Sequence, residues 1–292
     1  MKCIIVYGRG LDANDHQLYL ACKRLVGDVS LIRVSDLSAY VGSDGVRFWR
    51  GSREVTGVEL CFLRSLGSGG LEKMMARVGV LECMKAHGAA VINSAYALLN
   101  AKNKFYSSAR LAEAGLPVPK TYLTESAHWA YRATQGLRCT VYKPLLGSMG
   151  FGSMKFEDAD MAFNAYRRLE ELGQPLYVQE YVEAARDLRV MVVDGDVIAS
   201  MERVPPKGEW RANVARGGAV KPARISEDVE EASIRAAEAL NLFYAGVDVL
   251  ETREGPVLLE VNGSPHWQGL REATGVDVAG RLVEAAIRRI KR

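Results

Sequence analysis

Short apolar runs alternate with amphipathic stretches over the N-terminal third of the chain. The runs with the length and composition of buried strands lie at 4–6, 29–34, 60–63 and 90–93. Between them, residues 16–25 and a stretch that ends at 83–87 carry apolar positions at helical spacing. Strands separated by helices are typical of a parallel sheet, so we expect residues 1–98 to form a small α/β domain.

A second region begins after a helix that contains Lys104. The sequence Gly-Leu-Pro-Val-Pro follows at 115–119, where glycine and proline stop helical continuation. Over residues 121–178 the patterns read strand, helix, strand, glycine-rich loop, strand and helix. This order predicts an α+β lobe over residues 99–178.

Strands dominate the rest of the chain, which we expect to form a third lobe over residues 179–292. A turn is expected at 194–195, and two apolar strands should form a hairpin between 247 and 261. Helical spacing of apolar residues predicts a final helix over 276–292. The predicted fold class is therefore mixed, α/β followed by α+β.

Composition and charge exclude several classes of protein. The chain is 48% hydrophobic and 25% charged, as in folded globular proteins, and its net charge of +3 lacks the basic excess of a nucleic-acid binder. Five cysteines without a CxxC pair argue against a zinc site and a disulfide framework. The first apolar run is too short for a signal peptide or a membrane span, so we expect a cytoplasmic protein with neither membrane nor nucleic-acid partners.

The glycine-rich loop at 147–152 is the first candidate for chemistry. It reads Gly-Ser-Met-Gly-Phe-Gly between two strand-like segments, whereas a dinucleotide fingerprint or Walker loop leads from a strand into a helix. Glycines let backbone N–H groups approach phosphate oxygens, and Lys143 on the preceding strand carries a positive charge. The loop is consistent with a phosphate-covering lid; the alternative is a plain hairpin turn.

An acidic hairpin is the second candidate. If its two strands are symmetric about a turn near Glu254, Asp248 lies opposite Glu260, and Asn262 projects from the same face of the sheet. Facing carboxylates repel each other, so the arrangement calls for a cation, and Mg²⁺ prefers such oxygen ligands. The alternatives are a solvated polar face and a salt bridge to a basic neighbour.

A basic segment and an apolar strand complete the set of candidates. The segment carries Arg203, Lys207, Arg211, Arg216, Lys221 and Arg224. It fits either a solvated loop or a clamp for phosphates and carboxylates, which guanidinium groups bind in a bidentate manner. The strand at 176–182 can offer backbone N–H and C=O groups to an adenine ring.

Taken in order, these motifs resemble the ATP-grasp superfamily and, within it, the RimK-like glutamate ligases. The motifs are Lys104 ahead of the Gly-Leu-Pro-Val-Pro turn, Lys143 with the glycine loop, Val-Gln-Glu-Tyr-Val at 178–182, Asp-Leu-Arg at 187–189, Arg-Ala-Asn at 211–213, Asp248, and Glu-Val-Asn-Gly-Ser-Pro at 260–265. The resemblance covers residues 99–292 closely. It implies an ATP-grasp fold preceded by a Rossmann-like N-terminal domain.

The resemblance also implies roles for individual residues. The residues expected to hold ATP are Lys104, Lys143, Gly147, Ser148, Met149, Gly150, Phe151, Gly152, Gln179, Glu180, Tyr181, Val182, Asp187, Arg211, Ala212 and Asn213. Asp248, Glu260 and Asn262 are expected to bind two divalent cations, Mg²⁺ or alternatively Mn²⁺, in agreement with the hairpin. The remaining expected site residues, which would contact substrate carboxylates or the oxyanion, are Arg189, Arg203 and Arg216.

The reaction implied is amide formation through an acyl-phosphate, with L-glutamate added to a small pterin- or deazaflavin-type coenzyme. Two alternatives are a ligase that modifies a ribosomal or carrier protein, and a non-catalytic nucleotide-binding module on the same fold. The family also suggests a homodimer or homotetramer.

Three further residues have open roles at the level of sequence. Arg64 ends an N-terminal strand, where ligands often bind in parallel sheets. His266 and Trp267 replace the glycine that often follows the proline in this family, so recognition of the acceptor there is open. Trp267 either stacks on an aromatic acceptor or packs in the core, which is the commoner place for a tryptophan.

Overall fold

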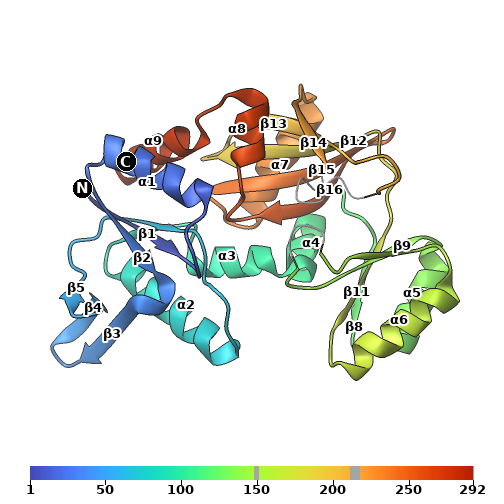
Figure 1. Ribbon diagram of the computed structural model, residues 1–292, viewed down its shortest axis with the longest axis horizontal. Coiled ribbons are helices and arrows are strands. Elements are labelled where there is room, and N and C mark those ends of the chain that lie inside the picture. Colours follow the sequence, from blue (N-terminus) through green and yellow to red (C-terminus); the bar gives the residue numbers. More distant parts are fainter. Residues whose placement is uncertain (148–150, 211–217, 292) are drawn as a thin grey trace.

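The computed structural model describes residues 1–147, 151–210 and 218–291, and its sheets form three successive lobes (Figure 1). The first lobe contains a parallel sheet of order β2-β1-β6-β7. Its elements are β1 Lys2–Tyr7, α1 Ala13–Leu25, β2 Asp28–Arg33, β6 Leu60–Leu63, α2 Leu71–Ala86, β7 Ala90–Ile92 and α3 Ala95–Lys102. The expected mixed fold class and parallel N-terminal sheet are confirmed.

Alternate residues of β1 belong to two different cores, which explains its continuous apolar run. Cys3 and Ile5 pack with α1 and the C-terminal helix α9 Val278–Lys291, whereas Ile4 and Val6 pack with α2. The parallel sheet therefore has helices on both faces.

A small antiparallel sheet, which the apolar pattern did not indicate, protrudes from this lobe (Figure 1). It consists of β3 Leu37–Gly42, β4 Gly45–Arg50 and β5 Arg53–Glu54, preceded by the 3-10 turn η1 Val34–Asp36. Four consecutive residues of β3 are exposed, so the strand lacks the apolar alternation that a packed strand shows.

The second lobe is a four-stranded antiparallel sheet, in the order β10-β9-β11-β8, that packs against two helices. Its elements are α4 Lys104–Glu113, β8 Thr121–Thr124, α5 Ala127–Leu137, β9 Thr140–Lys143, β10 Met154–Phe156, α6 Ala159–Glu171 and β11 Leu176–Glu180. The order expected from the sequence, with the glycine loop between two strands, is confirmed. Strand β11 spans the expected domain boundary at residue 178 and pairs with β8 and β9.

The third lobe is a five-stranded antiparallel sheet in the order β14-β13-β12-β15-β16. Its elements are β12 Arg186–Val193, β13 Asp196–Val204, β14 Ala219–Pro222, α7 Glu227–Ala239, β15 Tyr244–Thr252, β16 Gly255–Asn262 and α8 Gln268–Thr274. The turn at 194–195 and the β15–β16 hairpin are as expected, and α9 begins two residues later than predicted. The helix α7 was not predicted.

One face of this third sheet packs in the apolar core, and the other face carries charged side chains. On β12, Leu188, Val190 and Val192 pack in the core that includes α7, whereas Asp187 and Arg189 lie on the opposite face. Strand β15 behaves in the same way, because Val247 and Val249 join that core while Asp248 and Leu250 do not. The strand period therefore separates an apolar face from a charged face.

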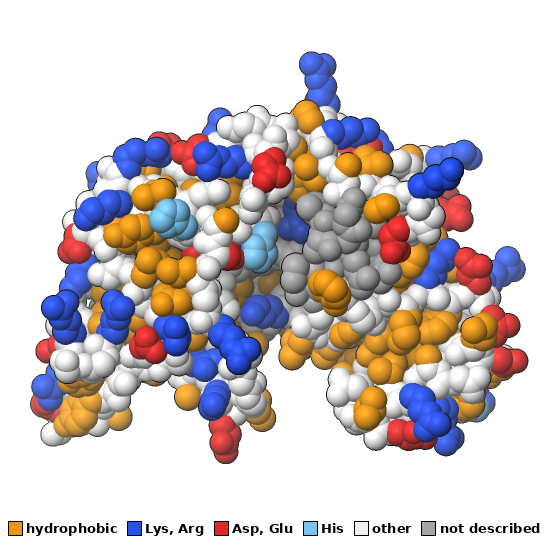
Figure 2. Space-filling view, viewed as in Figure 1, with side chains coloured by type: hydrophobic (Ala, Val, Ile, Leu, Met, Phe, Trp, Pro, Cys, Tyr) orange, Lys and Arg blue, Asp and Glu red, His pale blue; other side chains and the backbone are white. Residues whose placement is uncertain are grey.

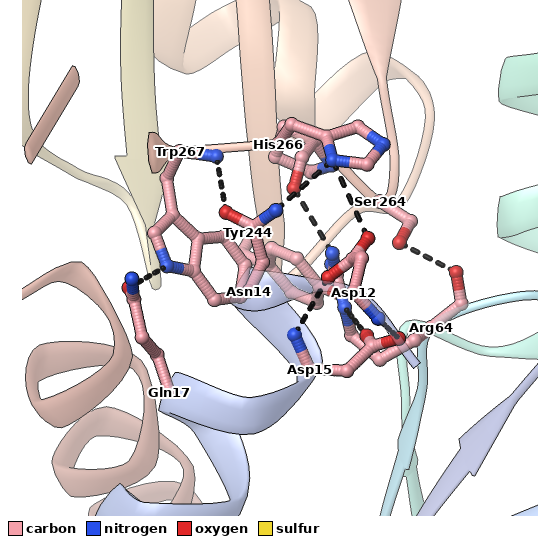
Figure 3. A network of polar contacts seen from close by, with 10 residues as sticks. Asp12, Asn14, Asp15, Gln17, Arg64, Tyr244, Ser264, His266 and Trp267 are labelled. Carbon is pink, nitrogen blue, oxygen red and sulfur yellow. Dashed lines mark hydrogen bonds and ion pairs between the residues drawn. The ribbon is translucent and has the colours of Figure 1, made fainter. Parts of the chain in front are cut away.

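Side chains and backbone groups of the N-terminal lobe hold every residue of the loop at 263–267, which follows β16. Figure 3 shows the contacts at Ser264, His266 and Trp267. Asn93 donates to Gly263 O, the Ser264 hydroxyl donates to Arg64 O, and Arg64 donates to Pro265 O. Asn14 contacts both His266 and Trp267. The loop is thus fixed by contacts between residues more than 150 positions apart.

Arg64 and Trp267 are parts of this interface rather than parts of an open site. Arg64 is 6% exposed and donates to Asp15 and to the Tyr244 hydroxyl, and its guanidinium lies 4.6 Å from the Trp267 ring centroid. Trp267 is fully buried, so it packs in the core and cannot stack on an acceptor. Within the described ranges, no helix has the length and apolar character needed to cross a bilayer.

Replacing Arg64 by alanine should destabilise the protein by about 3–5 kcal/mol, because it leaves Asp15 buried without its ion-pair partner. Urea unfolding followed by circular dichroism measures the change. The matched control is Arg24→Ala, which breaks the exposed pair between α1 and Asp277 and should cost less than about 1 kcal/mol. Equal losses in the two variants would contradict the role given to the buried pair.

Candidate active site

A cavity of about 870 Å³ lies between the second and third sheets and reaches the N-terminal lobe. Its lining includes residues of β9, β11, β12, β13, β15 and β16, of the loop after β16, and of the helices α1, α4 and α8. Figure 2 views the face of the molecule on which lysine and arginine side chains lie in the central hollow. The cavity therefore brings together candidates that are far apart in the sequence.

The acidic hairpin has the predicted pairing, for a reason that the sequence did not reveal. Asp248 lies opposite Glu260, as expected. The tight turn, however, pairs Thr252 with Gly255, and that register would place Asp248 opposite Leu259. A β-bulge between Asp248 and Val249 shifts the register by one residue and restores the pair.

The carboxylate of Asp248 is buried and lies between two arginines. Arg203 Nη1 donates to its Oδ2 at 3.2 Å, and Arg189 Nε lies 2.6 Å from its Oδ1. The salt bridge to a basic neighbour, one of the two alternatives for this hairpin, is therefore present. Asp248 Oδ1 and Arg189 Nε are both buried and form an ion pair without the geometry of a hydrogen bond. Carboxylate oxygens are also the ligands that a hard cation prefers, so the chemistry of Asp248 fits such a cation.

Two further oxygen ligands for such a cation stand on β16. Glu260 is one-third exposed and Asn262 lines the same cavity two residues further along the strand. In the part of the chain that is described, no three His, Cys, Asp or Glu side chains are grouped as a metal site. The expected set of Asp248, Glu260 and Asn262 contains only two such residues, with an amide oxygen as the third ligand.

Arg203 supports two carboxylates. It is 5% exposed and donates from Nε to Asp187 at 2.9 Å and from Nη1 to Asp248. Burial alone would lower the pKa of Arg203, but the charges of Asp248 and Asp187 raise it overall. Burial raises the pKa of Asp187, and Arg203 opposes that effect. With its guanidinium committed in this way, Arg203 is better placed to orient Asp187 and Asp248 than to bind a substrate.

Lys104 and Lys143 meet in the cavity from different elements. Lys104, at the start of α4, donates to Gly147 O at 2.5 Å and lies 3.9 Å from Glu260 Oε1. Lys143, at the end of β9, donates to Gln179 Oε1 at 2.6 Å. Burial, with a contribution from the charge of Lys104, lowers the pKa of Lys143 to about 8 against the opposing effect of Glu260. Two cations in one small space favour the binding of a polyanion.

The second sheet supplies an aromatic and apolar end to the cavity. Tyr181 and Trp210 lie with their rings edge to face at 6.2 Å, and Lys155 stands 4.0 Å above the Tyr181 ring. The predicted residues Gln179, Glu180, Tyr181 and Val182 line this end. Leu250 and Leu259 on the third sheet also line the cavity, so a flat ring can be enclosed between the two lobes.

The glycine loop is described only at its ends. Gly147 and Phe151 line the cavity, and Gly152 has a φ of +73°, where a side chain would be strained. A Cβ atom at Gly152 would also lie 2.9 Å from the Pro144 ring. The expected site residues Ser148, Met149, Gly150, Arg211, Ala212, Asn213 and Arg216 lie outside the described residues.

Many cavity residues were not among the expected site residues, and two of them, Asn14 and His266, contact each other. Asn14 on α1 is 2% exposed, and His266 after β16 has a side chain that is 68% exposed. The sequence did indicate that His266 is unusual, because His266-Trp267 departs from the family pattern after the proline. Nothing in the sequence linked Asn14 to it, because the two residues are 252 positions apart.

Comparison with protein families and curated proteins gives consistent matches. The model of the RimK-like ATP-grasp domain matches residues 101–286. A Methanocaldococcus jannaschii protein named tetrahydromethanopterin:alpha-L-glutamate ligase is 32% identical over 288 residues, which is 96% of each chain. An Enterobacter protein named probable alpha-L-glutamate ligase is 36% identical over 200 residues, 67% of each chain.

Solved structures share the fold. The ATP-grasp ligase PsnB complexed with minimal precursor has a TM-score of 0.80 and 23% identity, with 99% of each chain covered. A PsnB complex with a precursor variant, Mg and ADP has a TM-score of 0.79, with 23% identity and 99% and 98% covered. The D-cycloserine synthetase DcsG has a TM-score of 0.73 and 20% identity, with 99% and 100% covered.

The charge of Lys143, a partly buried residue, should make stability depend on pH in a specific way. Its pKa of about 8 in the folded chain lies below the ordinary lysine value, so the unfolded chain binds more protons between roughly pH 8 and 10. Below pH 8 the lysine is charged in both states and its desolvation penalty is fully present. The penalty disappears as the pH rises through this window.

Lys143→Met should therefore stabilise the protein by about 1–3 kcal/mol at pH 7, and this gain should shrink towards pH 10. Chemical unfolding at pH 7, 8, 9 and 10 measures the difference from the unsubstituted protein. Lys85→Met, at a lysine whose side chain is 53% exposed, is the control and should show no such trend. A gain for Lys143→Met that does not vary with pH would contradict the assignment.

Proposed function

Because the chain belongs to the RimK-like ATP-grasp ligase family, we propose that it adds L-glutamate to a carboxylate of a small coenzyme in an ATP- and Mg²⁺-dependent reaction. The observation that carries the ligase half of this proposal is the meeting of Lys104, Lys143, Asp248, Glu260 and Asn262 in one cavity. The glutamate half is supported by the names of the relatives, above all the methanogen protein that is similar over almost the whole chain.

The nucleotide is proposed to lie across the second sheet. Tyr181, Trp210 and Leu250 form an apolar enclosure for the adenine, and the β11 backbone at Glu180 to Val182 offers polar groups at its edge. Asp187 would then be near the ribose. Lys104 and Lys143 would contact the phosphates, with the glycine loop covering them.

The cations are proposed to be held by Asp248, Glu260 and Asn262, which provide the oxygen ligands that Mg²⁺ prefers. When bound, Mg²⁺ would neutralise the charge that develops on the transferred phosphoryl group. Two ions, with Mn²⁺ as a substitute, stay predictions. The same holds for a homodimer or homotetramer.

The proposed chemistry needs no nucleophile from the protein. A substrate carboxylate oxygen attacks the γ-phosphorus of ATP, the bond to the bridging oxygen breaks, and ADP leaves. The glutamate amine then attacks the acyl carbon and loses a proton, and inorganic phosphate leaves with the electron pair of the C–O bond. The task of the chain is therefore to orient the reactants and to stabilise negative charge.

Arg189 is the best placed of the expected arginines for contact with an organic substrate. It stands on β12 opposite Asp248, lines the cavity with a side chain that is 17% exposed, and contacts the Asp248 carboxylate through Nε and Nη2. Arg203 donates hydrogen bonds to Asp187 and Asp248 and so holds these two carboxylates in position. We propose that Arg189 binds a substrate carboxylate or the oxyanion of the tetrahedral intermediate.

An assay of phosphate release from ATP and Mg²⁺ tests the proposal directly. The panel contains tetrahydromethanopterin, tetrahydrofolate, a deazaflavin bearing a carboxylate and a peptide that ends in glutamate, each with and without L-glutamate. Release that requires a coenzyme and glutamate together, with a mass increase of one glutamate residue, is the expected result. Release with the peptide alone among the acceptors would favour protein modification, and none with any acceptor would favour a nucleotide-binding module.

Glu260→Gln should lower kcat at least about 100-fold, because it removes a charged oxygen ligand while keeping the shape of the side chain. Glu260 is one-third exposed, so the fold should be preserved and circular dichroism should be unchanged. Glu254→Gln, at the exposed turn of the same hairpin, is the matched control and should keep normal activity. Full activity of Glu260→Gln at limiting Mg²⁺ would contradict the metal assignment.

A further inference from the structure

The cavity continues past the proposed metal ligands to a part that the nucleotide does not explain. Strand β16, which contains Glu260 and Asn262, is followed directly by the loop that contains His266. Asn14 and Gln268 also line this part of the cavity. Figure 1 places α1 and α8 on the side of the third sheet away from β9 and β11. This part is therefore available to an organic substrate of the proposed reaction.

Asn14 has a fixed amide orientation. The backbone N–H of Trp267 can only donate, and it lies 2.9 Å from Asn14 Oδ1. The amide oxygen must therefore face Trp267, and the amide nitrogen faces the His266 ring, with Nδ2 at 2.9 Å from Nδ1 (Figure 3). Because Asn14 is 2% exposed, water does not compete strongly for these contacts.

The Asn14 amide in turn fixes the proton on the His266 ring. The amide nitrogen donates and cannot accept, so Nδ1 of His266 must be the acceptor and must carry no proton. The neutral ring then carries its proton on Nε2. Asp12 Oδ2 lies 3.4 Å from the same Nδ1 and favours a proton there, but a protonated Nδ1 would face the Asn14 N–H group at 2.9 Å.

Asp12 is also occupied elsewhere, because its other carboxylate oxygen accepts from Asp15 N at 2.8 Å as the N-cap of α1. The Asn14 contact is the shorter of the two contacts at His266 Nδ1, 2.9 Å against 3.4 Å. In Figure 3 the second ring nitrogen points away from the residues drawn. The His266 side chain is 68% exposed and lines the cavity, so this N–H group is accessible to a ligand there.

We propose that His266 is a specificity-determining residue that presents an Nε2–H donor to a carboxylate or carbonyl oxygen of an organic substrate, and that Asn14 is the positioning residue that holds it in this tautomer. The proposal rests on the proposed ligase function for the identity of that substrate. A ring with Nε2 protonated cannot act there as a general base, so the role is recognition.

The ring state can be read without any turnover. Two-bond ¹⁵N–¹H correlation spectra of the full chain, which has four histidines, distinguish the two neutral tautomers and the protonated ring, and His266→Gln identifies the signal. The expected result is the Nε2–H tautomer in the unsubstituted protein and a mixture in Asn14→Ala. An Nδ1–H tautomer or a protonated ring in the unsubstituted protein would overturn the proposal.

Gln17→Ala is the matched control for Asn14→Ala. Gln17 lies on the same helix and accepts from Trp267 Nε1 at 3.0 Å, but it contacts neither His266 nor the cavity. Its loss loosens the same tryptophan without touching the ring, so the Nε2–H tautomer should persist. If Gln17→Ala disturbs the tautomer as much as Asn14→Ala does, general loosening of the loop explains the effect and the positioning role is wrong.

Isosteric substitutions test the donor itself. The amide nitrogen of glutamine can take the place of Nε2, whereas asparagine reaches only the place of Nδ1. His266→Gln should therefore keep the KM values for L-glutamate and tetrahydromethanopterin within about 3-fold, whereas His266→Asn and His266→Phe should raise one of them about 10-fold, the loss of one hydrogen bond to a charged group. The KM for ATP should change less than about 2-fold, because the donor lies away from the proposed nucleotide site.

The substrate whose KM rises is the one that His266 contacts. Unchanged KM values for both organic substrates in His266→Asn would overturn the proposal. An increase in KM for His266→Gln as large as that for His266→Asn would also overturn it. If the unsubstituted protein shows no turnover, the proposed function is wrong. The inference about His266 is then tested separately, by titrating L-glutamate and tetrahydromethanopterin into the ¹⁵N-labelled protein. A shift of the His266 Nε2 signal with either compound supports the inference, and no shift with both overturns it.

Discussion

The charged face of the third sheet is the constraint on which the rest of the site depends. Asp187, Asp248 and Glu260 stand on this face, and Asp248 is almost completely buried. Carboxylates so close together require nearby cations, since neither water nor distance screens their repulsion. Arg203 and Arg189 supply two at Asp248, and Lys104 approaches Glu260. The carboxylates on this face are therefore surrounded by basic side chains that line the same cavity.

Much of this arrangement could be predicted because it depends on local rules. Strand periodicity placed Asp248 and Glu260 on one face, and the apolar runs gave the parallel sheet and the order of the second lobe. The register itself shows the limit of such rules. A two-residue turn predicts Leu259 opposite Asp248, and only the bulge beside Asp248 brings Glu260 there. The pair was predicted correctly although the bulge was not.

The elements that were missed have weak or distributed signals. Strand β3 is mostly exposed and lacks apolar alternation, and α7 buries small residues such as Ala232 and Ala236, which carry little hydrophobic contrast. The contact of Asn14 with His266 joins two lobes that are separated by nearly the whole chain. Such a contact follows from tertiary packing, and no spacing within one element could reveal it.

The position of Gly246 connects the charged face to the loop that carries His266. A Cβ atom there would lie 2.5 Å from Arg189 Nη1 and 2.7 Å from Pro265 Cβ, so both groups rest against the same stretch of backbone. The N-terminal lobe fixes Pro265 through Arg64, and the third sheet fixes Arg189 through Asp248. Because both are held against Gly246, the cation proposed to bind a substrate carboxylate and the donor proposed to select the substrate keep a constant separation. The contacts of the N-terminal lobe with Pro265 and His266 therefore fix the geometry of the proposed recognition site.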